Sequence, residues 1–482
     1  MAAAGSLCYS AGSVPPPPFT RILALLVLAP NVALAGGFEI PDRGTRALGR
    51  AGATAVGVTD PTALHYNPGA LSRLSGTRVL WHHNLILHET TFQRDPISAG
   101  WGGDAGTTFD LAEDGESFFP LGAFIAVSSD LGLTSDWTFA AGLYGPSGVG
   151  KHDYEDYGPQ SYMLTEMEAI LVYYSLAAAW SPNEDFGVGL TLQWVDMPMM
   201  EYELVVNGTS SERPNQLQPV PVDSGTLLKT RMVLSDRMAF SGIAGVWWRP
   251  AKWLETGLAG RFMPIGLEPE GGVETDKPTL ITDDLTAHMA LDLPMTARGG
   301  IRYLHYEGDR RWFDVELDVF WENWSTFDAF DVKLDGAISG QEVKDLSIPK
   351  AWQDSVSVRL GSGINLVDEV LEVSLGALVE EGAVPDNYTH LDYPSFDRLG
   401  LATGVVWDLG GYRLSASYMH IFQETRTVTE SRGKQFQQRP LHPCPEECEG
   451  LSGVVANAGT FESSYDLFSI GLEVVLGAGD EG

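Results

Sequence analysis

The chain has 482 residues, and its 30 lysines and arginines against 64 aspartates and glutamates give a formal net charge of −34. So acidic a chain argues against nucleic acid as a partner, because affinity for phosphate rests on lysine and arginine side chains. The 44% of hydrophobic residues argue against disorder, and the 54 glycines and 28 prolines argue against a helical bundle, since both residues disfavour helix interiors.

The first 35 residues have the pattern of a secretory signal peptide. Arg21 precedes the apolar run 22–29, and Ala33-Leu34-Ala35 supplies small residues at a cleavage site before Gly36. A positive charge, a short apolar core and a small-x-small site in this order are typical of export signals, whereas a membrane anchor needs a longer core. We therefore predict a signal peptide over residues 1–35.

Residues 36–76 are predicted to form a compact irregular segment. Gly44, Gly49, Gly52 and Gly57 punctuate it before the turn sequence 67–69, Asn-Pro-Gly. Small residues and turn formers at this density suit a backbone that packs closely against other backbone. If the rest of the chain closes into a barrel, the space available for this segment is the lumen.

Between residues 77 and 476 the dominant pattern is alternation with a period of two. One stretch has apolar residues on one face and acidic residues on the other: Phe313, Val315, Leu317, Val319 and Trp321 against Asp314, Glu316 and Asp318. Side chains at i and i+2 share a face of a strand, so such a segment is a strand with one wet face. About fourteen strands are predicted, near 77–93, 118–130, 137–146, 168–181, 186–200, 230–249, 253–265, 287–305, 312–327, 354–366, 370–382, 398–408, 411–423 and 463–476.

The connections between these strands alternate in length. Short turns, such as 129–132, 182–185 and 408–411, alternate with connections of about 15 to 40 residues, an arrangement typical of outer-membrane barrels. No run of 18 apolar residues follows residue 36, so any membrane span is expected to be made of strands. We predict an all-β fold, a transmembrane antiparallel β-barrel over 77–476 with a short tail over 477–482, because a closed sheet leaves no unpaired backbone in hydrocarbon.

A secreted β-sandwich or propeller is the alternative, but an aqueous fold has no reason to sort its loops by length. Tryptophans at predicted strand ends also favour the barrel, because they can form belts at the membrane interfaces. They are Trp180, Trp194, Trp247, Trp253, Trp312 and Trp324.

Few side chains suggest a site for chemistry. Cys444 and Cys448 are predicted to form a disulfide in an exported protein, with free thiols or a metal pair as alternatives. The sequence 145–151 resembles a phosphate-binding loop, but His152 stands where a magnesium-binding hydroxyl is required. His82, His83 and His88 suggest no metal cluster, because adjacent strand residues face opposite ways. We therefore expect no catalytic residue, no cofactor and no metal site.

Several motifs resemble the FadL family, the outer-membrane transporters of long-chain fatty acids and other hydrophobic molecules. Gly49-Arg50-Ala51-Gly52 followed by Asp60 and Asn67-Pro68 resembles the hatch sequence of that family, and residues 143–148 resemble its third strand. Further matches follow in family order at 293–294, 321–327, 352–354, 384–385 and 394–398.

The resemblance implies a fourteen-stranded barrel plugged by an N-terminal hatch over 36–76, with Gly49, Arg50, Asn67 and Pro68 among its residues. It also implies passive movement of a hydrophobic ligand from an outer groove to an inner pocket, and then sideways into lipid where the third strand kinks. Gly145, Pro146 and Gly148 can make that kink, because proline lacks a ladder donor and glycine permits unusual dihedral angles. An ordinary strand end entering a loop is the alternative.

Two departures from the family concern the ligand. Asn67-Pro68 is followed by Gly69 rather than alanine, and Glu201 falls close to a basic position of the family. Lys344 and Lys350 remain as candidates for pairing with a ligand carboxylate, or they are solvated loop charges.

The sequence therefore predicts a barrel in the outer membrane of a Gram-negative bacterium, surrounded by its lipid and acting as a monomer. The predicted function is passive transport of hydrophobic small molecules, with long-chain fatty acids as the leading cargo and neutral hydrocarbons as the other. A nonspecific porin and an adhesin or structural barrel that binds partners through its outer loops are the competing functions.

Overall fold

The computed structural model describes residues 37, 40–115, 119–132, 136–145, 151–210, 217–442 and 453–476. The predicted signal peptide, Cys444, Cys448 and the tail 477–482 lie outside these residues. No helix in these ranges is long and apolar enough to cross a membrane.

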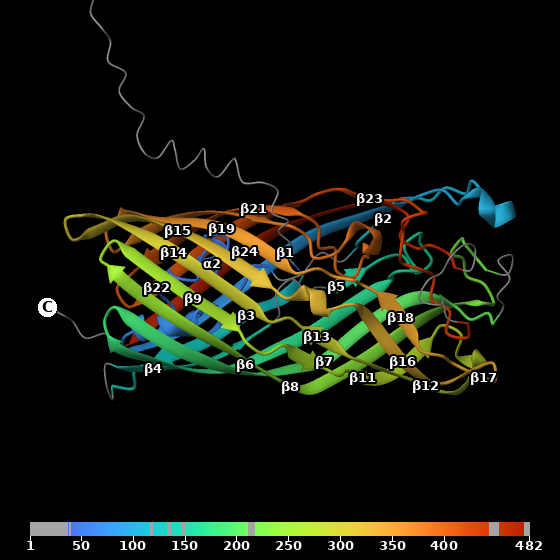
Figure 1. The fold of residues 1–482 in the computed structure, drawn as a ribbon, viewed down its shortest axis with the longest axis horizontal. Coiled ribbons are helices and arrows are strands. Elements are labelled where there is room, and N and C mark those ends of the chain that lie inside the picture. The colour runs from blue at the N-terminus through green and yellow to red at the C-terminus, as the bar shows by residue number, and fades with distance from the viewer. Residues whose placement is uncertain are drawn as a thin grey trace, which may run out of the picture.

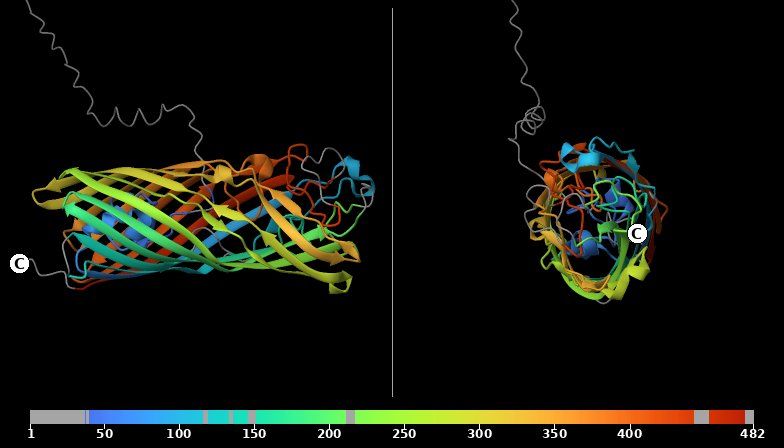
Figure 2. Two further views of the ribbon diagram at one scale, coloured as in Figure 1. Left: turned by 60° about the horizontal axis from the view of Figure 1, so that its bottom comes forward. Right: turned by 90° about the vertical axis from the view of Figure 1, so that its right-hand side faces the viewer.

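The chain forms a closed antiparallel barrel of fourteen strands, as predicted. Two strands far apart in sequence close it, since the register between the first and the last runs from Thr77 opposite Leu476 to Arg94 opposite Gly459. Figure 2 shows the closed wall in a view along the barrel. In chain order the wall consists of β1 (Thr77–Arg94), β3 (Phe119–Ser129), β4 (Trp137–Tyr144) with β5 (Lys151–Asp153), β6 (Glu166–Asn183), β7 (Phe186–Asn207), β8 (Leu227–Ala251), β9 (Leu254–Arg261), β14 (Thr296–Glu307), β15 (Arg310–Glu322), β19 (Ser355–Val367), β20 (Leu371–Glu380), β21 (Arg398–Asp408), β22 (Tyr412–Gln423) and β24 (Gly459–Leu476).

The alternating pattern sorts side chains between lumen and lipid. On β15 the acidic Asp314, Glu316 and Asp318 are buried inside, whereas Val315 and Val319 are exposed on the outside. The same outward apolar face recurs around the wall, as a membrane-embedded barrel requires. Its exposed members include Ile125, Leu176, Leu192, Leu258, Ile301, Leu360, Leu375, Leu401 and Ile470.

Two of the predicted interfacial tryptophans are placed differently. Trp180, Trp194, Trp253 and Trp312 are exposed as expected. Trp247 and Trp324 are buried, so their assignment to a belt is wrong. Trp247 faces the lumen below the guanidinium of Arg73, which lies 4.5 Å from its ring centroid, and Trp324 packs edge-on against Trp352.

At one end of the barrel, the right-hand end of Figure 1, the long connections carry further strands. The alternation predicts loops for most of these residues. In the structure most of the further strands join the sheet of the wall, whereas 265–267 and 291–293 form a separate two-stranded sheet. The additional strands are β2 (Ala112–Glu113), β10 (Ile265–Leu267), β11 (Glu270–Thr275), β12 (Ile281–Met289), β13 (Leu291–Leu293), β16 (Ala329–Ile338), β17 (Gln341–Glu342), β18 (Leu346–Pro349) and β23 (Arg426–Val428).

Short helices complete the described structure. In the N-terminal segment, defined here as residues 40–76, they are α2 (Thr45–Leu48), α3 (Ala63–Tyr66) and the 3-10 helix η1 (Pro68–Arg73). The remaining 3-10 turns lie in the connections, at η2 (Ala99–Asp104), η4 (Pro278–Leu280), η5 (Trp324–Thr326) and η6 (Asp386–Tyr388).

Candidate functional site

The N-terminal segment lies inside the barrel, between the strands of opposite walls (Figure 1). Almost every residue from Ile40 to Leu71 is buried, although the regular structure of the segment is limited to two single-turn helices and η1. A segment of this kind cannot bury itself, so its burial comes from the barrel around it.

Glycines in the N-terminal segment and in the strands of the wall permit this packing. A Cβ atom added to Gly376 of β20 would lie 2.2 Å from the carbonyl carbon of Arg50, and one added to Gly49 would lie 2.9 Å from the Cα of Gly404. Real side chains do not tolerate such separations, so the glycines are needed for the backbones of the segment and the wall to touch.

The same argument explains Gly69, where the resemblance to the FadL family leads us to expect alanine. A Cβ atom there would lie 2.8 Å from the carbonyl oxygen of Gly245 and 2.9 Å from that of Gly187. In this chain η1 approaches β7 and β8 too closely for alanine.

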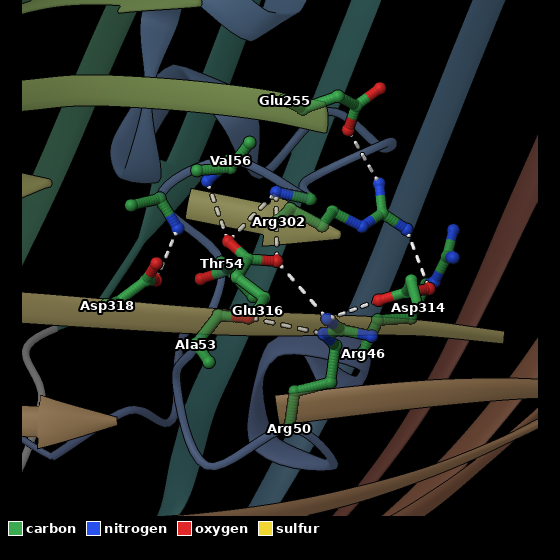
Figure 3. Close-up of polar contacts among 12 residues, drawn as sticks. Arg46, Arg50, Ala53, Thr54, Val56, Glu255, Arg302, Asp314, Glu316 and Asp318 are labelled. Carbon is green, nitrogen blue, oxygen red and sulfur yellow. Dashed lines mark hydrogen bonds and ion pairs between the residues drawn. The ribbon is translucent and has the colours of Figure 1, made fainter. Parts of the chain in front are cut away.

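Arg50 holds the segment to the acidic face of β15 (Figure 3). Its Nη2 donates to Asp314 at 2.7 Å and to Glu316 at 3.2 Å, with all three side chains buried. Asp314 is shared with Arg302, which donates to it at 2.8 Å and to Glu255 at 3.1 Å. The charges of the lumen wall are therefore arranged in a network that includes the segment.

Backbone amides of the segment use the same carboxylates. The N–H groups of Val56 and Gly57 donate to Glu316 at 2.8 and 3.0 Å, and that of Ala55 donates to Asp318 at 2.8 Å. The sequence predicts a wet lumen around these acidic side chains. In the structure they accept hydrogen bonds from backbone N–H groups of the irregular segment, which has no strand pairing to satisfy them.

Asn67 and Pro68 lie at the turn into η1. The Asn67 amide donates to the carbonyl oxygen of Ala55 at 2.7 Å and to that of Val246 at 3.0 Å, and its oxygen accepts from the Gly69 N–H at 3.1 Å. One side chain therefore ties together two parts of the segment and strand β8. Pro68 occupies the first position of η1, where its missing N–H costs nothing.

The third strand is interrupted where the sequence predicts a kink. β4 ends at Tyr144, opposite Tyr173 of β6, and β5 resumes at Lys151, opposite Glu168. Six residues, 145–150, thus separate the paired positions on one strand and four, 169–172, separate them on the other, so the two registers are not continuous. Gly145 is described and has no strand structure, while Pro146 and Gly148 lie outside the described residues.

An apolar pocket lies among the strands that extend the wall. It holds about 560 Å³ of atom-free space, a figure that includes space open to solvent. Its lining is mainly aliphatic, with Leu204, Met232, Leu285, Val332, Val343 and Ile348 among its residues, and its polar members are Thr230, Thr275 and Gln438.

The two candidate lysines differ sharply. Lys350 is buried and its ammonium contacts Asp392 at 2.5 Å, beside the ring of Phe330. Burial raises the pKa of Asp392, but the charges of His390 and Lys350 outweigh it and hold that pKa well below its usual value. The charge of Lys350 is therefore compensated within the protein.

Lys344 is exposed and lies at the rim of the pocket. Its neighbour Val343 lines the pocket, and its N–H donates at 2.8 Å to the carbonyl oxygen of Pro440, another lining residue. Glu201, the acidic departure on β7, is buried and pairs with Arg231. Its charge is thus also compensated.

Comparison with known proteins agrees with this architecture. The chain is similar to a crystal structure of a Pseudomonas aeruginosa FadL homologue, at 13% identity and a TM-score of 0.71, covering 91% of this chain and 100% of that one. It is also similar to the toluene transporter TodX of P. putida, at 12% identity and a TM-score of 0.61, covering 92% and 99%. The toluene transporter TbuX of Ralstonia pickettii gives 12% identity and a TM-score of 0.61, covering 91% and 100%.

At these identities the structures show the shared fold. No curated protein matches the sequence. The family model described as outer membrane protein transport protein (OMPP1/FadL/TodX) matches residues 26–455. Because that match spans most of the chain, the protein belongs to the OMPP1/FadL/TodX family of outer-membrane transporters of hydrophobic compounds.

Proposed function

We propose that the protein takes up long-chain fatty acids passively, with the tail in the apolar pocket and the carboxylate at its rim. The observation that carries this proposal is the aliphatic pocket together with the exposed residue Lys344, whose neighbour Val343 and backbone partner Pro440 both line it. Burial of apolar surface, worth about 25 cal/mol per Å², drives capture of the tail. Lys350 is not the expected partner of the fatty acid carboxylate, because that lysine is already paired with Asp392.

Neutral hydrocarbons are the second candidate cargo. The sparse polar lining of the pocket favours them, and two of the similar structures are those of toluene transporters. Such a ligand would use the same pocket and would need no cation at its rim.

Within this proposal the N-terminal segment acts as a hatch, and the interruption after Tyr144 is the exit. The hatch keeps polar solutes out, while a ligand released from the pocket leaves sideways where β4 and β5 lack a continuous ladder. Partition into lipid supplies the driving force, so no energy source is required.

Replacing Lys344 by glutamine separates the two cargo classes. We expect the affinity for a fluorescent long-chain fatty acid to fall by about twofold to fivefold, since an exposed ion pair contributes up to about 1 kcal/mol. Affinity for naphthalene, which has no charge, should stay the same. Equal affinities of wild type and variant for the fatty acid would mean that Lys344 does not bind the carboxylate, and would favour neutral cargo.

Placing a carboxylate in the pocket tests the pocket itself. Val332 is buried in its lining, so Val332→Glu is expected to weaken binding of both probes by about tenfold or more, because an unpaired charge is costly in apolar surroundings. Val222→Glu makes the same change at an exposed position and should bind as wild type. Heat-modifiable migration in gels verifies the barrel of each variant. Unchanged binding by a folded Val332→Glu would place the ligand elsewhere.

A further inference from the structure

Three ligating side chains outside the transport machinery converge on one point. His88 of β1, His152 of β5 and Asp114, which follows β2, contribute them. Asp114 Oδ2 lies 2.7 Å from His88 Nε2 and 2.7 Å from His152 Nδ1, and the two nitrogens are 3.2 Å apart. In the sequence, His88 and His152 lie 26 and 38 residues from Asp114, so their spacing gave no sign of this cluster.

The arrangement suits a divalent transition-metal ion. Imidazole and carboxylate are ligands of zinc and its neighbours, and an ion about 2.1 Å from each atom fits just outside the plane of the three. The Asp114 side chain is fully buried and those of His88 and His152 nearly so, and a buried carboxylate requires a compensating positive charge.

Surrounding groups hold the ligands in place without using the converging atoms. The other oxygen of Asp114 accepts from the Asp153 N–H at 3.0 Å. The ring of Tyr465 stacks on His88 at 5.7 Å between centroids, and that of Tyr154 stacks on His152 at 6.4 Å. Fixed rings and an anchored carboxylate are the usual support of a metal site.

The position of the cluster gives an ion there a structural consequence. β1 pairs with β3 near the short-turn end and with β2 near the other end, while β5 pairs with β6. The cluster lies at β5, the part of the third strand that follows the interruption, and it brings side chains of β1 and of the residue after β2 together with one of β5. The hydrogen bond from the Gly115 N–H to the carbonyl oxygen of Asp153 lies beside it.

We propose that His88, Asp114 and His152 form a site for a divalent transition-metal ion such as Zn²⁺, which ties β1 and β2 to β5 above the break in the third strand. The proposal is independent of the cargo, since none of the three residues lines the apolar pocket.

The test is zinc binding by the untagged full-length mature barrel in detergent. After treatment with a chelator and exchange into zinc chloride, we expect elemental analysis to find one zinc ion per chain. Asp114→Asn keeps the shape of the side chain but removes its charge, and His152→Gln removes a ligand, so both should bind at least tenfold more weakly. His420→Gln is the matched control, because His420 Nδ1 pairs with Asp466 at 2.8 Å outside the cluster, and it should bind as wild type.

A second readout reports on the ligands directly. Cobalt substituted into wild type should give an absorption spectrum of nitrogen and oxygen ligation that is absent from Asp114→Asn. Heat-modifiable migration verifies that each variant is folded. If His152→Gln does not fold, the zinc content of Asp114→Asn alone tests the proposal. No zinc above the detergent blank in wild type, or equal zinc in wild type and folded Asp114→Asn, would overturn the proposal.

Discussion

Deleting residues 40–74 is expected to turn a closed barrel into an open channel. The deleted chain fills the bore and covers the acidic face of β15, so its removal leaves Asp314, Glu316 and Asp318 facing water. A lumen lined by ionised groups hydrates readily, and barrels of only slightly larger strand number conduct when unplugged. The measurement is swelling of liposomes in small sugars, supported by conductance across planar bilayers. The full chain should be closed to both.

The deletion also separates the transporter from the competing functions. A nonspecific porin would pass sugars with the segment present, whereas an adhesin would be indifferent to its loss. If the deleted barrel assembles, as shown by heat-modifiable migration, and still excludes sugars, the segment is not the hatch.

Replacing Arg50 by methionine is expected to loosen the N-terminal segment while leaving the barrel assembled. The change removes the donor to two fully buried carboxylates, Asp314 and Glu316, although Arg302 and the amides of Val56 and Gly57 still contact them. Removing one partner from a buried ion pair costs about 3–5 kcal/mol. Hydrogen exchange of the segment, followed by mass spectrometry, should show its opening free energy lowered by about this amount.

Arg249→Met is the matched control for this prediction. Arg249 contacts Asp185 at 2.7 Å, the same distance as Arg50 to Asp314, but both side chains are substantially exposed. An exposed pair contributes about 0–1 kcal/mol, so exchange in the N-terminal segment should stay as in wild type. Equal protection of the segment in Arg50→Met and Arg249→Met would mean that the network around β15 does not hold it.

The barrel could be predicted because its signal is local. Alternation such as Phe313 to Trp321 follows from the two-residue period of a strand, and it needs no knowledge of distant contacts. The predicted segments 398–408 and 411–423 agree with β21 and β22 within one residue at each boundary. The placement of Trp247 failed because neighbouring tryptophans occupy opposite faces, and the sequence alone did not show that Trp248 rather than Trp247 faces outward.

The sites depend on contacts between distant residues, and those were less predictable. The pocket is built from strands such as β11, β12 and β16, whose alternation is short and interrupted by glycine and acidic residues. Lys344 and Lys350 are equivalent in the sequence, and only the fold brings Asp392 to one of them. A motif identified Arg50 as a residue of the N-terminal segment, but it did not identify the partners Asp314 and Glu316, which lie more than 260 residues away.

Uptake by whole cells measures most directly whether a barrel closed to polar solutes admits hydrophobic molecules. Cells that produce the full chain in their outer membrane are compared with cells that produce Val332→Glu or no barrel. We expect faster uptake of a radiolabelled long-chain fatty acid with the wild-type chain alone, and equal, slow entry of sucrose in all three. Fatty acid and toluene uptake no faster than in cells without the barrel, or sucrose entering as fast as the hydrophobic probes, would contradict this expectation.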